Sequence, residues 1–407
     1  MKRTAPNLRH LRAFRSVAFH QSISRASEEV FLSQPAITQA IANIEKALDI
    51  ELFLRRTDGV FLTDAGKLFL RRSERADYYL RTGVEEALAV SGAKKKNTFA
   101  KLDQLISGVQ MRALIAVSET GNFSLAARSV GISQPSLYRA ARDLERLSEI
   151  TLFKKDSRGI SLTPAAVVWA RYAKLAFAEL SQTYMEIEEF KGIDTGRIVV
   201  GTMPLARSYV LPSAINQVTH KRPGVEISVI DGRYEELLHG LRHGEIDLLI
   251  GALRDPPPID DVVEEALFDD SLALIVRSGH PLENNENITI EQLSAYPWIT
   301  PRSGSPTRVK FEALYAASPT LRPTSIIEAS SLVLIRGLLM DSDRITILSA
   351  HQVRQEKEWG HLSLLSFNLT DAQRPIGLTM RKEWHPTASQ AEFIDALRRA
   401  GRDVGAN

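Results

Sequence analysis

The sequence predicts a multidomain protein in which two small all-α domains of one plan, each with a β-hairpin, precede an α/β domain of two lobes. The first observation is a repeat, because residues 11–66 align without a gap with residues 111–166. Ser33-Gln34-Pro35 recurs in this way as Ser133-Gln134-Pro135. A repeat of this length at a fixed offset indicates a duplicated supersecondary unit. The second observation is that strand-length apolar runs alternate with helical segments beyond Gly196, as in parallel sheets with helical crossovers.

Each repeat unit, copy one (11–66) or copy two (111–166), has the pattern of helix, turn, helix and helix. The first helix is indicated by apolar residues at helical spacing, such as Leu11, Phe14 and Val17. Ser24 and Ser124 are expected to cap the second helix, and Ser33 and Ser133 the third, with a proline in its first turn. A basic hairpin over 55–62 then leads to a new helix from Thr63. This order is that of a winged helix-turn-helix.

The residues of copy one also resemble a known family. Ser-Gln-Pro-Ala at 33–36, Glu45, Leu52-Phe53, Gly59-Val60 and Leu62-Thr63-x-Ala-Gly are similar to the DNA-binding domain of LysR-type transcriptional regulators. The resemblance implies that the third helix enters the major groove and that the wing approaches phosphate. The DNA-contacting residues expected in copy one are Ser33, Gln34, Pro35, Ala36, Thr38, Gln39, Arg55 and Arg56, and those in copy two are Ser133, Gln134, Ser136, Tyr138, Arg139, Lys155 and Arg158.

The two copies differ in ways that leave two interpretations of copy two. Copy one has Asp58 at the wing tip, where the family usually has a basic residue; copy two keeps Arg158 there but has Asp156 in the wing and Tyr138 on the third helix. Copy two is therefore either a spacer or a second DNA-binding module. Residues 1–96 hold 17 Lys and Arg against 11 Asp and Glu, and residues 97–196 hold 12 against 11. Overall charge favours the spacer, whereas local basic residues such as Arg139 and Arg142 favour binding by both copies, which we expect.

The remainder of the chain resembles the two-lobed effector domain of the same family, which is similar to periplasmic solute-binding proteins. The expected domains are 1–66 and 98–166 (winged helix-turn-helix copies), 67–97 (helix and basic linker), 167–195 (linker and dimerisation helix) and 196–407 (effector-binding domain). Ligands of such α/β domains bind outside the carboxyl ends of strands. The effector-binding residues expected on this basis are Thr202, Met203, Leu205, Arg233, Ala252, Thr300, Ser305 and Ser330.

Other functional classes lack support in the sequence. The chain has no cysteine, which excludes disulfides and thiolate metal sites. His239 and His243 have the spacing of a helical metal pair but no third ligand nearby, so no metal or cofactor is expected. No nucleophile elbow, phosphate loop or zincin motif is present, so we expect no enzyme. A solute-binding protein would have no use for two helix-turn-helix units. Without a signal segment or an apolar membrane span, the chain is expected to be cytoplasmic, with no membrane partner.

The resemblance also implies partners. They are double-stranded DNA, a small-molecule effector such as a sugar or an aromatic acid, a second copy in a homodimer or homotetramer, and RNA polymerase. Effector binding between the lobes would change how the oligomer holds its DNA sites.

Overall fold

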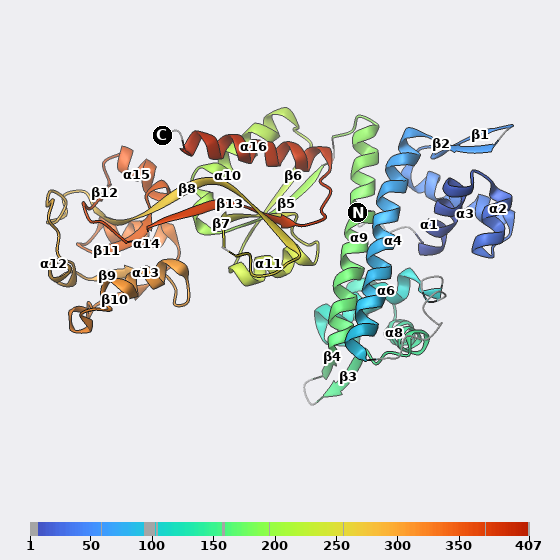
Figure 1. Ribbon diagram of the computed structural model, residues 1–407, viewed down its shortest axis with the longest axis horizontal. Helices are drawn as coiled ribbons and strands as arrows, with labels where there is room; N and C mark the ends of the chain where they lie inside the picture. Colours follow the sequence, from blue (N-terminus) through green and yellow to red (C-terminus); the bar gives the residue numbers. More distant parts are fainter. Residues whose placement is uncertain are drawn as a thin grey trace. The chain divides into compact units, whose positions relative to one another are not determined.

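The computed structural model describes residues 7–57, 59–92, 102, 105–156, 159–194, 196–254, 256–370 and 372–405. The chain forms two compact units (Figure 1). The first contains residues 1–196 with 242–245, and the second contains residues 197–241 with 246–407. None of the helices in these described ranges has the length and apolar composition that a bilayer crossing requires.

Copy one folds as its sequence predicts, with one corrected cap. Its elements are α1 (Leu8–His20), α2 (Ile23–Val30), α3 (Gln34–Leu48), β1 (Phe53–Arg56) and β2 (Gly59–Leu62). The side chain of Ser33 caps α3 by accepting a hydrogen bond from the Ala36 N–H, as expected. The prediction that Ser24 caps α2 is wrong, because Ser22 is the N-cap and accepts from the Arg25 N–H. Ser24 lies inside the first turn of α2 and is therefore available for another contact.

Copy two repeats this arrangement element by element. It contains α6 (Gly108–Thr120), α7 (Phe123–Val130), α8 (Gln134–Ser148), β3 (Phe153–Asp156) and β4 (Gly159–Leu162). Ser133 caps α8, as expected, whereas Asn122 rather than Ser124 caps α7. In both copies, then, the residue that caps the second helix stands two positions before the serine that was expected to cap it.

Two long helices connect the copies into one body. Copy one continues into α4 (Asp64–Ser91) and copy two into α9 (Pro164–Phe190). α4 and α9 lie side by side (Figure 1), and Gly83 of α4 allows close approach because a Cβ there would be 2.6 Å from the Cβ of Tyr172. A single apolar core runs through both copies and both long helices. The basic linker expected before copy two lies, from residue 93 to 101, outside the described residues.

The second unit is built on one twisted sheet in two halves. In the first half β5 (Arg197–Thr202) lies between β6 (Glu226–Asp231) and β7 (Leu248–Ala252), parallel to both. Three helices accompany these strands, α10 (Val210–Lys221), α11 (Tyr234–Arg242) and the C-terminal α16 (Ala388–Gly405). A short 3-10 helix, η1 (Pro204–Arg207), follows β5, and α10 begins only at Val210.

Two antiparallel strands join the halves of the sheet, β8 (Val262–Arg277) and β13 (Gln373–Arg381). The second half contains β9 (Trp298–Thr300), β10 (Ile326–Glu328), β11 (Ile345–Ser349) and β12 (Leu362–Leu364). Its helices are α12 (Ile290–Ser294), α13 (Pro306–Leu314), α14 (Leu332–Met340) and α15 (Arg354–Glu358), with 3-10 turns η2 (Pro319–Leu321) and η3 (Ala350–Val353). β8 spans both halves, since it pairs with β13 over Val262–Ser271 and with β11 over Leu272–Ile275.

Candidate DNA-binding surface and effector site

The third helix of copy one presents the polar side chains that the sequence indicates. Gln34, Ala36 and Gln39 are exposed, Thr38 is half-buried, and Ile37 on the opposite face is fully buried. This division follows from helical periodicity, since residues three and four apart share a face. α3 therefore anchors itself through isoleucines and leaves an amide- and hydroxyl-bearing face toward solvent.

Two of these amides already have side-chain partners. Gln34 Nε2 donates to Ser24 Oγ over 3.4 Å, and Gln39 Nε2 donates to Asn43 Oδ1 over 3.0 Å. The first contact recurs in copy two, where Ser124 Oγ donates to Gln134 Oε1 over 2.9 Å. Ser24 and Ser124 thus orient the glutamine at the start of the third helix, a role that the sequence did not suggest.

A carboxylate fixes the third helix to the wing in both copies. Glu45 Oε1 accepts hydrogen bonds from the N–H groups of Leu52 (2.8 Å) and Phe53 (3.3 Å). Glu145 Oε1 accepts from Leu152 (2.7 Å) and Phe153 (3.0 Å). Each wing is also held to the turn after the first helix, since Val60 N–H donates to the Gln21 carbonyl and Ile160 N–H to that of Gly121. The motif glutamate is therefore a positioning residue for helix and wing together.

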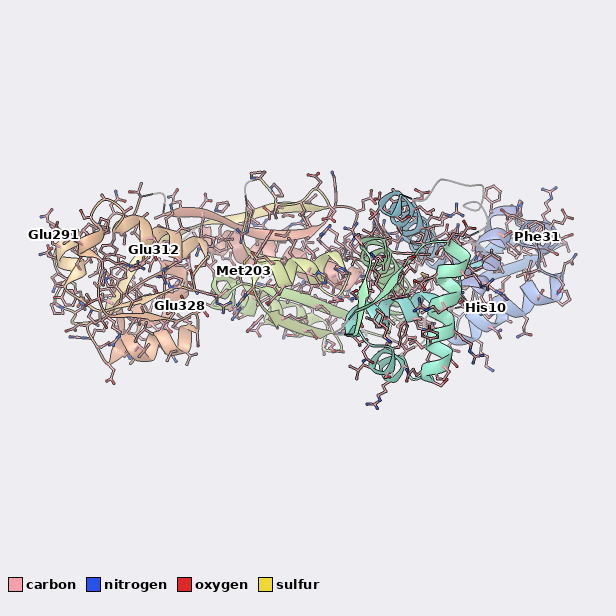
Figure 2. All side chains as sticks on the ribbon, turned by 90° about the horizontal axis from the view of Figure 1, so that it is seen from below. His10, Phe31, Met203, Glu291, Glu312 and Glu328 are labelled. Carbon is pink, nitrogen blue, oxygen red and sulfur yellow. The ribbon has the colours of Figure 1, made fainter. Side chains whose placement is uncertain are left out.

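The turn between the second and third helices differs between the copies. Phe31 of copy one (Figure 2) has a φ of 53° and is 83% exposed. Gly131 occupies the same place in copy two with a φ of 74°. The left-handed backbone conformation costs free energy for phenylalanine, whereas glycine adopts it readily. An exposed aromatic ring thus stands beside the start of α3 and has no counterpart beside α8.

Copy two presents a different face on its third helix. Tyr138 is exposed, packs edge-on against Phe123, and lies beneath the Arg142 guanidinium, 5.0 Å from ring centre. Arg142 also forms an ion pair with Glu145. Arg139 is exposed and Ser136 half-buried. The Arg142 guanidinium is thus occupied by contacts with Tyr138 and Glu145 of copy two. Among the residues expected to face DNA on α8, Arg139 is the exposed cation.

Both wings carry exposed cations at their described positions. Arg55 and Arg56 lie on β1, and Lys154 and Lys155 on β3, all exposed. The tip residues Asp58 and Arg158, and the side chain of Asp156, lie outside the described residues.

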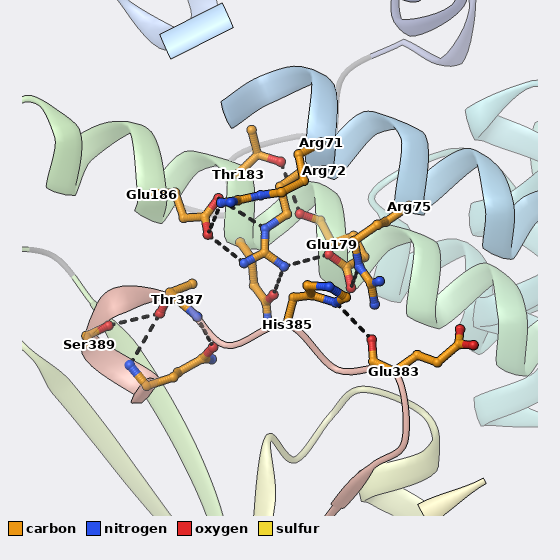
Figure 3. A network of polar contacts seen from close by, with 12 residues as sticks. Arg71, Arg72, Arg75, Glu179, Thr183, Glu186, Glu383, His385, Thr387 and Ser389 are labelled. Atoms are coloured by element: carbon orange, nitrogen blue, oxygen red, sulfur yellow. Dashed lines mark hydrogen bonds and ion pairs between the residues drawn. The ribbon is translucent and has the colours of Figure 1, made fainter. Parts of the chain in front are cut away.

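The two long helices are joined by a buried ionic network (Figure 3). Arg72 of α4 is 1% exposed and donates to Glu179 (2.7 Å), Gln182 (2.9 Å) and Glu186 (2.6 Å) of α9. Arg75 pairs with Glu179, and Arg71 with Glu186. Burial alone would lower the pKa of Arg72, but Glu186 and Glu179 outweigh it and raise the pKa above its ordinary value. The buried guanidinium is therefore charged and fully paired.

The expected effector residues of the first sheet half gather at the ends of β5 and β7. Thr202 is buried, and its hydroxyl donates to the Met203 carbonyl. Met203 (Figure 2) packs on Gly251, where a Cβ would meet its Cε at 2.0 Å, and its N–H donates to the Ile250 carbonyl. Leu205 is buried and Ala252 half-buried. Arg233 stands apart, exposed after β6.

The expected residues of the second half form a tighter group. Ser305 caps α13, and Ser330 Oγ accepts from Arg302 over 3.4 Å. Ser331, the residue after Ser330, caps α14. Thr300 is fully buried and its hydroxyl accepts from Arg308 over 2.8 Å.

Carboxylates surround this second group. Arg308 pairs with Glu312 (2.7 Å) and lies 3.6 Å from Glu328, both labelled in Figure 2. Glu328 also accepts from the Ser303 N–H. The Arg308 guanidinium thus has protein partners in Thr300, Glu312 and Glu328. Arg302 and Ser330 are exposed to solvent, and Ser305 is partly exposed.

A polar chain on the joining strands was not apparent from the sequence. Asp270 of β8 is fully buried and accepts from Ser349 Oγ and from Arg374 Nε of β13. Arg374 in turn donates to Thr307 in the first turn of α13. Burial raises the pKa of Asp270, although Ser349 and Arg374 oppose it. In the sequence Asp270 stands between Asp269 and Ser271, so no apolar surroundings marked it as a buried group.

His239 lies on α11 and His243 directly after it. Within the described ranges no three or more His, Cys, Asp or Glu side chains converge in a way that would hold a metal ion.

A helix-turn-helix unit followed by an α/β domain of two strand-linked halves defines a ligand-responsive DNA-binding protein, and comparison with known proteins gives the family. Residues 8–67 and 109–167 match the bacterial regulatory helix-turn-helix protein, lysR family, and residues 191–402 match the LysR substrate binding domain. The chain belongs to the LysR family of transcriptional regulators, which are not enzymes.

Individual relatives agree with this assignment. The chain is 33% identical over 376 residues to the HTH-type transcriptional regulator GalR of Pseudomonas putida, covering 92% of each chain. It is 25% identical to PcaQ of Agrobacterium fabrum, over 74% of this chain and 97% of that one. The alignment with GalR is longer than the segment 108–407 and so includes part of copy one. A full-length variant of OxyR from Pseudomonas aeruginosa shares the fold, with a TM-score of 0.51, 22% identity and coverage of 72% and 94%.

Proposed function

We propose that the chain regulates transcription with two DNA-binding winged helix-turn-helix modules, copy one and copy two, under control of an effector bound by the C-terminal domain. The observation that carries the first part is the repetition of one set of features. Both copies have a serine-capped third helix, a glutamate that holds the wing, and exposed cations on the first wing strand. A spacer would need the apolar core of copy two but not its exposed Arg139, Lys154 and Lys155.

The residues proposed to contact DNA have two kinds of role. Gln34, Thr38 and Gln39 in copy one, and Arg139 in copy two, have hydrogen-bonding groups suited to base edges. Arg55, Arg56, Lys154 and Lys155 are placed to neutralise phosphate. The remaining residues, Ser33, Pro35, Ala36, Ser133, Gln134, Ser136, Tyr138 and Arg158, are proposed to shape or line the same surfaces.

The effector site is proposed to lie between the residue groups at the two sets of strand ends. The second group favours an anion, because Arg302 is exposed and the N-terminus of α13 carries a partial positive charge, while Arg308 pairs with the neighbouring Glu312 and Glu328. An aromatic acid therefore fits better than a neutral sugar. The Asp270–Arg374–Thr307 chain would connect a ligand at α13 to the joining strands.

Assembly into a homodimer or homotetramer and contact with RNA polymerase are proposed from the family resemblance.

The test has two parts. Genome-wide mapping of bound DNA should show discrete sites that are lost in a variant with both wings neutralised. Calorimetry of the full chain against a panel of aromatic acids and sugars should find an acid that binds the native protein and not Arg302→Ala. Binding of neutral sugars alone, unaffected by Arg302→Ala, would refute the proposed anion site.

A further inference from the structure

The two long helices make equivalent contacts when the copies are exchanged. Arg72 of α4 contacts Glu179 and Glu186 of α9. The repeat equivalent of Arg72 is Tyr172, which packs against Tyr79 and Gly83. Burial raises the pKa of Tyr172, Arg171 lowers it, and the Glu86 carboxylate raises it, so Glu86 also acts on this ring. Positions 79 and 86 are the repeat equivalents of 179 and 186. Exchanging α4 and α9 therefore exchanges the contacts of position 72 with those of position 172. This is the relation expected of two antiparallel helices about a two-fold axis.

The contacts are equivalent in position but not in chemistry. At one end a buried guanidinium lies between two carboxylates, and at the other an aromatic ring packs on a glycine. A pair of two α9 helices would place Tyr172 against Glu179 and Glu186, leaving both buried acids without Arg72. Buried charges without a partner are strongly disfavoured. A pair of two α4 helices would place Arg72 against Tyr79, Gly83 and the exposed Glu86.

The connection between the copies is compatible with pairing inside one chain. Just before α6 the chain contacts copy one, because Arg12 of α1 donates to the Ile106 carbonyl over 3.0 Å. Leu102 and Ile106 are buried in the shared core. The segment that precedes α6 is thus fixed against the first module.

We propose that one chain forms by itself the two-fold DNA-reading unit, with copy two as the partner of copy one, and that this unit recognises two unlike half-sites. The proposal rests on the proposed function, in which both copies bind DNA. A two-fold axis between α4 and α9 places the two recognition helices, α3 and α8, equivalently on one side. Dimeric helix-turn-helix proteins read half-sites about 34 Å apart in this way.

The length of the pair fits that spacing. α4 and α9 each begin at their own module and run antiparallel, so the modules stand at opposite ends. A helix of 27 residues, the length of α9, is about 40 Å long at 1.5 Å per residue. Both helices begin with a glutamine, Gln34 or Gln134, but the half-sites must differ, because α3 presents Thr38 and Gln39 where α8 presents Tyr138 and Arg139.

Pairing within one chain is tested by a disulfide. The chain has no cysteine, so Tyr79→Cys with Tyr172→Cys, whose rings face each other with centroids 6.5 Å apart, introduces in the full-length protein a single pair across α4 and α9 and keeps Gly83. Oxidation should consume both thiols and leave the mass of one chain on a denaturing gel, while each single variant keeps its thiol. A disulfide-linked dimer would show that α4 pairs with α9 of another chain, and two free thiols would show no pairing; either result overturns the proposal.

Recognition of unlike half-sites is tested by in vitro selection of random duplexes on the full-length protein. The expected motif has two different halves about one helical turn apart. Gln34→Ala should relax one half and Arg139→Ala the other, each lowering affinity for the selected site about tenfold. An inverted repeat whose halves both respond to one substitution would overturn the proposal, as would a single half with no response to Arg139→Ala. A failure of any sequence to enrich would instead contradict the proposed DNA-binding function.

Discussion

Arg72 Nη1 lies 2.7 Å from Glu179 Oε2 across the interface between α4 and α9. Both side chains are buried, so removing the Arg72 cation leaves Glu179 and Glu186, in a low-dielectric environment, with the more exposed Arg75 and Arg71 as partners. Arg72→Met should lower the free energy of unfolding of the first unit by about 3–5 kcal/mol. Denaturant unfolding followed by circular dichroism measures this.

Two matched variants separate charge from packing. Arg71→Ala removes a half-exposed partner of Glu186 and should cost no more than about 1 kcal/mol. Arg72→Met combined with Glu179→Gln and Glu186→Gln should recover much of the loss, because no buried charge then lacks a partner. Equal losses in Arg72→Met and in this triple variant would contradict the electrostatic explanation.

The elements of each module were predictable because their signals are local. Ser33 followed by Pro35 specifies a helix start, and the structure confirms it. The beginning of β8 was not predictable, because its acidic side chains find their partners only in the folded chain, where Glu265 pairs with Arg398 and Glu264 accepts from Thr379. Their partners lie more than a hundred residues away. The pairing of α4 with α9 was not predicted for the same reason, because the partners of Arg72 also lie more than a hundred residues away.

Base recognition by α3 is tested through Gln34. Gln34→Ala removes an amide that can donate to and accept from a base edge, and should cost about 1–3 kcal/mol at the preferred site. Ser24→Ala removes the hydroxyl that orients the amide and leaves the amide in place, so its effect should be smaller. Binding measured by fluorescence anisotropy on the preferred and on altered duplexes distinguishes them. An unchanged site preference in Gln34→Ala would exclude base readout by this residue.

Phosphate contact by the wings has a different signature. Replacing Arg55 and Arg56, or Lys154 and Lys155, by glutamine should weaken binding to all sequences alike. Each lost contact should reduce the slope of log affinity against log salt by about one. Titrations at several salt concentrations on specific and unrelated duplexes measure the slope. Loss on the specific duplex alone would indicate base contact instead.

Effector binding near α14 is tested by a bulky substitution at Ser330. Ser330→Trp should abolish the response to ligand, because the new ring displaces Arg302 and fills the space beside it. DNA binding without ligand should remain, since the first unit is unchanged. The control is Ser342→Ala, which alters a serine that donates to the Leu338 carbonyl at the other end of α14. Unaltered ligand affinity of Ser330→Trp in calorimetry would remove Ser330 from the site.

The pH dependence of the second unit should depend on His280. The ring is buried; Leu282 N–H donates to Nδ1 over 3.1 Å and Nε2 lies 3.3 Å from the Asp343 carbonyl. Nδ1 must therefore be unprotonated in the folded state, and burial lowers the pKa of His280 below its ordinary 6.5. Nearby Arg277 also lowers it, whereas Asp343 and Glu283 oppose the shift.

The sign of the resulting effect is fixed by linkage. Below pH 6.5 the unfolded chain binds a proton at this position that the folded chain resists, so stability is complete above about pH 7 and is lost as pH falls from 6.5 toward the folded pKa. His280→Asn, whose amide oxygen can accept from Leu282 N–H, should flatten this dependence. His385→Asn alters an exposed histidine and should leave it unchanged. Thermal unfolding between pH 5 and pH 8 measures the difference, and parallel curves for the native chain and His280→Asn would show that this ring does not control the acid sensitivity.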